Sequence, residues 1–249
     1  RENVRFDIAG SVTLGIGAVL ILGAVSQGPK WGWDSPSTIS MAVLGVISLV
    51  AFVQVERRVA DPLVVLAWFR TRNVAFPVMS QALANFAYMG GFILAPQVLV
   101  KGLGLSESTT GFLVIARPLS FSIIAPIAGF VTIKIGERIA GVAGGVAVVV
   151  SMVCWSLVGL STPLWFIVIA LAMSGVGLGI ASPAMTSLTA NAVDESALGV
   201  AGAMQQLMVQ LGAVVGTVVL TTVSIDGGEG NLAPYQHAFW VAAGVATLG

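Results

Sequence analysis

The stretch "STTGFLVIARPLSFSIIAPIAGF", residues 108–130, decides the fold class. A transmembrane helix needs about 20 mainly apolar residues, and this stretch is long enough, with Arg117 as its only charged side chain. Arg117 follows Glu107 by ten residues, which is about 15 Å of helix, or roughly half the thickness of a bilayer core. The stretch therefore predicts a membrane-spanning helix that carries a guanidinium near mid-depth.

The composition of the whole chain also predicts a membrane protein. Charged residues make up 9% of the sequence, against about 25% in soluble domains, and apolar residues make up 57%. The mean hydropathy is +0.98. A β-barrel would alternate apolar and polar residues in segments of about ten, whereas the apolar runs here are continuous and longer. We expect an all-α polytopic membrane protein with room for about eight spans.

Short polar breaks divide the sequence into apolar segments. These segments are 8–26, 37–55, 73–100, 108–132, 138–159, 162–190, 197–224 and a shortened 236–249. The break "SQGPKWGWDSPS" predicts a tight turn with Trp31 and Trp33 at the membrane interface. The apolar stretch "PLVVLAWF", residues 62–69, is too short to cross and is expected to lie on the membrane surface.

Lysine and arginine predict the orientation of the spans. The breaks on one side hold only Lys30 and Lys101, whereas those on the other side hold Arg1, Arg5, Arg57, Arg58, Arg70, Arg72, Lys134 and Arg138. Because cytoplasmic loops are enriched in Lys and Arg, we expect the first residue and the 56–72 loop to be cytoplasmic.

Glycine and proline within the spans predict how the helices pack and bend. The motifs "GVAGG" (141–145), "GVGLG" (175–179) and "GAVVG" (212–216) place small residues where helix backbones can approach each other. Each proline within a span leaves one backbone carbonyl unpaired, and lipid cannot satisfy that carbonyl. Pro96, Pro118, Pro126 and Pro183 all fall within spans. Broken helices are typical of transporters.

Two long stretches carry a family resemblance. "FDIAGSVTLGIGAVLILGAVSQGPKWGW" (6–33), followed by "FVQVERRVADPLVVLAWFRTRNVAF" (52–76), resembles the middle of major facilitator superfamily transporters of the fourteen-span drug:proton antiporter type. The positions that match the family's pattern are Phe6, Asp7, Gly10, Gly32, Trp33, Glu56, Arg57, Pro62, Leu63, Phe69, Arg70 and Arg72. Downstream, "SGVGLGIASPAMTSL" (174–188) and "GVAGAMQQLMVQLGAVVG" (199–216) are similar to the family's Gly-rich span and its Gln-Leu-Gly-Gly stretch.

The resemblance covers essentially the whole chain and implies its organisation. Residues 1–72 would be two extra transmembrane helices with a cytoplasmic surface loop. Residues 73–249 would be the C-terminal six-helix half with its last helix truncated. The N-terminal six helices would be missing, so we expect a fragment of a multi-pass protein of the bacterial plasma membrane.

One cytoplasmic loop retains part of a family motif. "GFVTIKIGER" (129–138) keeps Gly129, Lys134, Gly136 and Arg138 of the superfamily's Gly-x-x-x-Asp-Arg-x-Gly-Arg-Arg pattern. Ile133 stands at the Asp position of that pattern, and Val209 stands where the family usually has Arg. The two departures leave the family's usual gating ion pairs in doubt for this half, but not its fold.

Polar side chains within the spans are the candidate site. Two stripes at helical spacing are Gln81, Asn85 and Tyr88 on 73–100, and Gln206 and Gln210, with Gln205 beside them, on 197–224. Polar groups in lipid are costly, so we expect both stripes to face the bundle interior. They would either line a cargo cavity or hydrogen-bond neighbouring helices.

Arg117 is the remaining candidate. An unpaired cation at that depth costs several kcal/mol, so it should also face the interior. Its partner would be either the Val114 carbonyl that Pro118 leaves unpaired, or an acid across the cavity in the missing half. The first partner suggests a structural clamp, and the second, which we favour, suggests a gating or coupling residue that responds to protonation of that acid. Every acid here lies at or beyond a span end, so a proton carrier is expected in the missing half.

The predicted function is secondary active transport. The resemblance implies proton-coupled efflux of hydrophobic or amphipathic drugs by alternating access, with the bilayer, the cargo and protons as partners. His237 is the only histidine and no metal or catalytic cluster is evident, so we expect no enzyme activity and no cofactor. Nucleic acid is not expected because there is no basic tract. The alternatives are an exporter of an endogenous metabolite or lipid, or a non-transporting channel or scaffold subunit.

Overall fold

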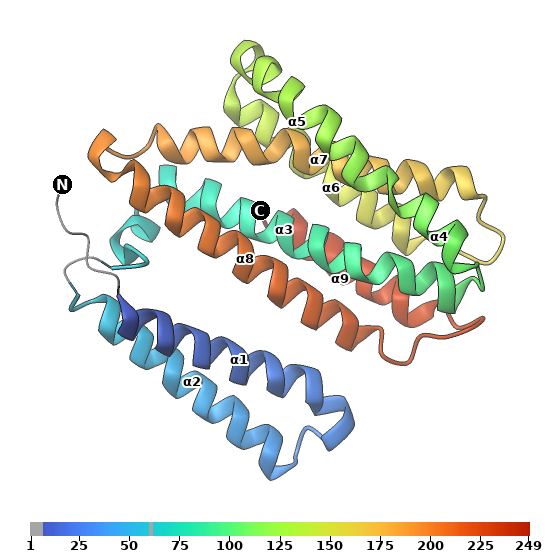
Figure 1. Ribbon diagram of the computed structural model, residues 1–249, viewed down its shortest axis with the longest axis horizontal. Helices are drawn as coiled ribbons and strands as arrows, with labels where there is room; N and C mark the ends of the chain where they lie inside the picture. Colours follow the sequence, from blue (N-terminus) through green and yellow to red (C-terminus); the bar gives the residue numbers. More distant parts are fainter. Residues whose placement is uncertain (1–6, 60–61) are drawn as a thin grey trace. The chain divides into compact units, whose positions relative to one another are not determined.

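The computed structural model describes residues 7–59 and 62–249, and the chain forms two compact units, Arg1–Ala75 and Phe76–Gly249. Within the described residues there is no β-strand, only an isolated bridge between Gly228 and Asn231. Figure 1 shows that helices make up nearly all of both units. The predicted all-α class is confirmed.

The first unit contains a hairpin of two long helices. These are α1 (Ile8–Trp31) and α2 (Pro36–Glu56), which run antiparallel (Figure 1). Small residues allow the close contact, since a Cβ on Gly17 would lie 2.6 Å from the Leu49 side chain. The Ser48 hydroxyl also donates to the Thr13 carbonyl at 2.8 Å. A 3₁₀ helix, Leu66–Arg70, overlaps the segment 62–69 that we expect on the membrane surface.

The helix α1 is longer than predicted. We placed a turn from residue 27, and that boundary was wrong, because the helix continues through Pro29 to Trp31. It ends at Gly32, whose φ of 90° favours glycine and whose N–H donates to the Gly28 carbonyl at 2.9 Å. Ser35 then caps α2 by accepting the Thr38 N–H at 3.2 Å.

The second unit is a helical bundle. Its elements are α3 (Arg72–Gln97) with a π-helical extension (Val98–Gly102), α4 (Glu107–Val114), α5 (Ala116–Ile135), α6 (Glu137–Ser156), α7 (Leu164–Ala190), a 3₁₀ turn (Glu195–Ala197), α8 (Leu198–Val223) and α9 (Ala233–Thr247). In the described part of the chain, seven helical segments are long and apolar enough to cross a membrane, and they correspond to the first seven predicted spans. The eighth, α9, has 15 residues.

The predicted span 108–132 is interrupted at Ile115, between α4 and α5. The cause is Pro118, which has no N–H to donate to the Val114 carbonyl. The helix resumes when the Leu119 N–H donates to the Ile115 carbonyl at 3.1 Å. Arg117 therefore lies in the first turn of α5, directly after the break.

The helix α7 is central to the bundle, because both α5 and α6 pack along it. At the contact with α6, a Cβ on Gly144 would lie 2.5 Å from the Gly177 carbonyl oxygen. The "GVAGG" motif therefore does mark a close contact. Gly144 meets the backbone of α7, whereas a Cβ on Gly141 would meet the flexible end of the Met185 side chain at 2.4 Å and one on Gly145 would meet nothing within 4 Å.

Two other contacts complete the bundle. Cβ atoms on Gly212 and Gly216 of α8 would overlap the backbone carbonyls of Ala82 and Phe86 on α3, so these two helices touch backbone to backbone. The helix α9 packs against α6, where the Phe239 ring stacks on Trp155 with centroids 5.1 Å apart. Close contact at the "GAVVG" motif is confirmed.

Candidate functional site

Arg117 lies fully buried at the junction of three helices. Its Nε donates to the Ser174 hydroxyl of α7 at 2.6 Å, and its Nη1 donates to the Tyr88 carbonyl of α3 at 3.1 Å. The guanidinium carbon also lies 4.8 Å from the centroid of the Tyr88 ring, within cation–π range. A side chain of α5 thus connects α3 and α7.

Of the two expected partners of Arg117, the Val114 carbonyl is not the one used, and the acid across the cavity stays a prediction. The hydrogen bonds of Arg117 go to Ser174 and Tyr88, not to the Val114 carbonyl. Its Nη2 has no hydrogen-bond partner among the described residues and lies 3.3 Å from where a Cβ on Gly91 would be. The Ser174 hydroxyl itself donates to the Leu171 carbonyl at 2.7 Å, so its oxygen is free to accept from Arg117. Among the described residues, the guanidinium of Arg117 is therefore bonded to neutral groups, and its Nη2 has no acceptor.

The predicted stripe on α3 faces the interior. Gln81 and Asn85 are both buried, and the Gln81 amide donates to the Ser182 hydroxyl of α7 at 3.0 Å. Gln81 also accepts a hydrogen bond from the amide of Gln205 on α8. The Asn85 amide donates within its own helix, to the Gln81 carbonyl at 3.0 Å. The Gln81–Ser182–Gln205 cluster thus joins α3, α7 and α8.

The residue of α8 that belongs to this cluster is Gln205, not Gln206 or Gln210 of the predicted stripe. Gln206 and Gln210 are exposed in this chain, whereas Gln205 is buried. The sequence contained the signal, because Gln205 precedes Gly212 and Gly216 by seven and eleven residues, which places all three on one helical face. Since that face contacts α3, the glycines identify the buried glutamine.

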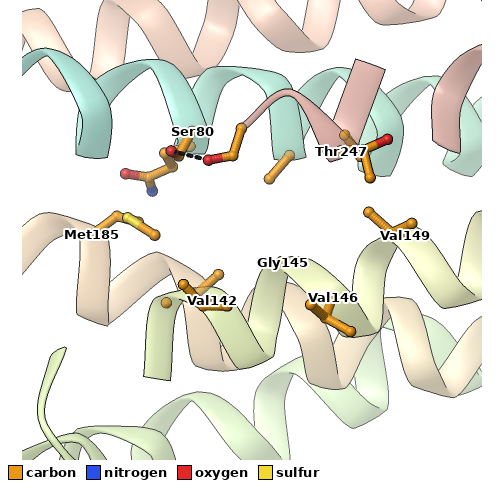
Figure 2. Close-up of a pocket in the computed structure, with 13 residues that line it drawn as sticks. Ser80, Val142, Gly145, Val146, Val149, Met185 and Thr247 are labelled. Atoms are coloured by element: carbon orange, nitrogen blue, oxygen red, sulfur yellow. Dashed lines mark hydrogen bonds between the residues drawn. The ribbon is translucent and has the colours of Figure 1, made fainter. Parts of the chain in front are cut away.

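A small pocket lies beside the cluster. Figure 2 shows Val142, Val146 and Val149 of α6 on one side, opposite Ser80 of α3 and Thr247 of α9. Its volume is about 200 Å³, and Gln81 is also part of its lining. Pockets for drug-sized ligands hold about 300–1,000 Å³. The volume of this pocket is enough for an apolar group but is too small for a whole drug molecule.

The loop between α5 and α6 retains the geometry of a tight turn. Gly136 has a φ of 87°, and its N–H donates to the Thr132 carbonyl at 2.9 Å, which ends α5. Lys134 and Arg138 are exposed on either side of it, and a Cβ on Gly129 would meet nothing within 4 Å. Of the four motif positions, Gly136 is the one whose backbone requires glycine.

Glu137, which sequence reasoning treated only as an acid at a span end, makes interhelical contacts. Its carboxylate accepts hydrogen bonds from the Ser187 hydroxyl and, at 3.0 Å, from the Asn191 amide. The first residue of α6 is thereby joined to the end of α7. No pattern in the sequence predicts this contact, because its partners lie about 50 residues away.

The long apolar helices and the polar groups buried between them are those of a polytopic membrane protein. Residues 78–249 match the family model described as Major Facilitator Superfamily, which is more than half of the chain. The chain therefore belongs to the major facilitator superfamily.

Several relatives have names that refer to resistance. The chain is 25% identical to the multidrug resistance protein Stp of Mycobacterium tuberculosis over 93% of this chain and 43% of that protein. It is 27% identical to the tetracycline resistance determinant of Streptomyces rimosus, over 93% and 67%. It is 28% identical to the tetracenomycin C resistance and export protein of Streptomyces glaucescens, over 88% and 41%. The chain thus spans less than half of the length of two of these three relatives.

Proposed function

We propose that this chain is part of a secondary active transporter that exports hydrophobic or amphipathic drugs across the bacterial plasma membrane in exchange for protons. Residues 1–72 supply two extra helices and a cytoplasmic loop, and residues 73–249 supply a C-terminal six-helix half. An N-terminal six-helix half completes the transporter. The two halves rock around a site near the bilayer midplane, without an enzymatic step.

The observation that carries this proposal is the burial of polar side chains between spans of a major facilitator chain. Ionisable and polar groups inside a membrane are costly and typically mark transport pathways. Here they gather on α3, α5, α7 and α8, as Arg117 and the Gln81–Ser182–Gln205 cluster. Relatives named for resistance to drugs and antibiotics support the cargo class.

The exposed residues Gln206 and Gln210 of α8 support the proposal that this face of the helix meets the other half of the transporter. Gln206 and Gln210 lie on a face that no helix of the second unit covers. We assign this face to the transport cavity, with the two amides as hydrogen-bond partners for cargo. Gln81 and Asn85 are assigned to helix contacts behind it, because both are buried within the unit.

We assign Arg117 to the clamp role, with gating as the runner-up. Its side chain is completely buried and bonded to α3 and α7, so it fixes α5 directly after the break at Ile115. The unused Nη2 donor favours the runner-up, because an anionic group of the other half could accept from it in another conformation. Arg117→Lys keeps the charge without the planar fork of donors, and Arg117→Gln keeps donors without the charge.

The test is transport by the full-length protein in vesicles, with an amphipathic dye and an imposed proton gradient. Gradient-dependent dye export supports the proposal. Lipid or metabolite export without dye export supports the endogenous exporter, and unsaturable conductance supports a channel. For Arg117, a clamp predicts that both variants lose folded protein in step with activity. A Gln variant that melts like wild type but has lost proton-linked export would assign the arginine to gating instead.

A further inference from the structure

Two buried carboxyl groups lie together at the base of the α1–α2 hairpin. Asp7 caps α1, and its Oδ1 accepts the Gly10 N–H at 2.8 Å. Glu56 is the last residue of α2, and its Oε2 accepts the Val64 N–H at 3.1 Å. The two side chains are 6% and 4% exposed. In each carboxyl group, one oxygen is thus engaged by a backbone donor.

The other oxygen of each group has no hydrogen-bond partner among residues 7–59 and 62–249, and both oxygens face the same point. These oxygens are Oδ2 of Asp7 and Oε1 of Glu56, and both are buried. A Cβ on Gly10 would overlap Oδ2 and lie 2.8 Å from Oε1. The charged groups on the adjoining described segments, Arg57, Arg58 and Arg70, are all exposed. The two unpartnered oxygens therefore converge at a position that only glycine leaves open.

Two ionised carboxylates in this position would repel each other, and both charges would be poorly solvated. One proton held between them removes one charge and gives both unpartnered oxygens a hydrogen bond. Carboxyl pairs of this kind titrate as a unit. A metal ion fits less well, because the described residues contain no group of three or more His, Cys, Asp or Glu side chains that could hold one.

We propose that Asp7 and Glu56 form a proton-binding site that holds one shared proton. The site would hold α2 against the start of α1 and would anchor the following loop through Val64. It belongs to the hairpin alone and is independent of the cargo. It also places a protonatable pair in a part of the chain where the sequence suggested only acids at span ends.

The test is the pH dependence of thermal unfolding in the full-length protein, together with infrared difference spectra of its carboxyl groups. A proton bound more tightly in the folded state stabilises the protein at low pH, and this stabilisation is lost as the pH rises through the titration of the folded pair. Between the pKa of the unfolded carboxyl groups and that of the folded pair, the folding equilibrium of the wild type should fall by about tenfold per pH unit, and above the titration of the folded pair it should level off. In Asp7→Asn or Glu56→Gln, an amide N–H replaces the proton permanently, so either variant should flatten this dependence.

The infrared band of a protonated carboxyl group should disappear from the wild type on alkalinisation, and either amide variant alone should remove it. Asp34→Asn is the matched control, since Asp34 is an exposed acid near the other end of the hairpin and its loss should change neither readout. The proposal is wrong if the single variants keep the wild-type profile or if only one of them alters it. It is also wrong if sodium restores stability at high pH, which would indicate a cation site. The same holds if Arg5→Gln abolishes the profile, which would indicate an ion pair with that arginine.

Discussion

Neighbouring glycines on α6 allow the packing of α6 against α7 to be measured with an internal control. Gly144 and Gly145 lie in the middle of the same helix, so changing either to alanine gains the same helix propensity, about 1 kcal/mol. At Gly144 the new Cβ would lie 2.5 Å from the Gly177 carbonyl oxygen and 2.6 Å from the Ala181 nitrogen. These are backbone atoms of α7, which cannot rotate away as a side chain can. At Gly145 it would enter open space beside the pocket of Figure 2.

The difference between the two variants therefore isolates the steric cost. Overpacking a tight contact costs about 1–3 kcal/mol, so Gly144→Ala should be less stable than Gly145→Ala by roughly 5- to 150-fold in the folding equilibrium. For a cooperative unit of 150–250 residues, this corresponds to a melting temperature lower by about 2–12 °C. The assay is thermal unfolding of the full-length protein in detergent, with both variants expressed in parallel. Equal melting temperatures, or a more stable Gly144→Ala, would refute the close approach of α6 and α7.

Two further predictions follow from the contacts of α8 and from the charge bias of the loops. Gln205→Ala removes the side chain that donates to Gln81 and should lower the free energy of unfolding by about 1 kcal/mol. Gln206→Ala should leave the melting temperature unchanged. Equal effects of the two variants in an unfolding assay would contradict the assigned face of α8. In a Cys154→Ala background, single cysteines can replace Ala67 and Glu229, which are both exposed. In intact cells, an impermeant thiol reagent should label the cysteine at 229 but not the cysteine at 67. The reverse labelling would overturn the predicted orientation.

The sequence predicted what depends on hydrophobic periodicity and small residues. Seven spans, the all-α class and the close contact at the "GAVVG" motif follow from patterns that lie within a single helix. The end of α1 was misplaced because Pro29 is a weak stop so near a helix end, and Gly32 with its positive φ is the actual one. A local pattern identifies an element more reliably than it locates the last residue.

The partners of the candidate residues were harder to predict. Arg117 reaches Ser174 and Tyr88, which are 57 and 29 residues away, and neither is marked by spacing to Arg117. Proline chemistry predicted an unpaired Val114 carbonyl but could not decide whether the arginine would use it. Gln205 was the exception, because the glycines on its face of α8 already indicated burial. To predict a contact between distant segments, one must first know which face each helix turns toward its neighbours, and only some residues indicate that face.

The backbone contact between α3 and α8 limits how such a protein can evolve. Where Gly212 and Gly216 touch the carbonyls of Ala82 and Phe86, there is no side chain that selection could vary without forcing the helices apart. Under the proposed function, new cargo preferences would have to arise on the faces beside this contact, at positions such as Gln206 and Gln210. Laboratory selection for resistance to a new compound should therefore recover changes at the glutamines and leave the two glycines untouched.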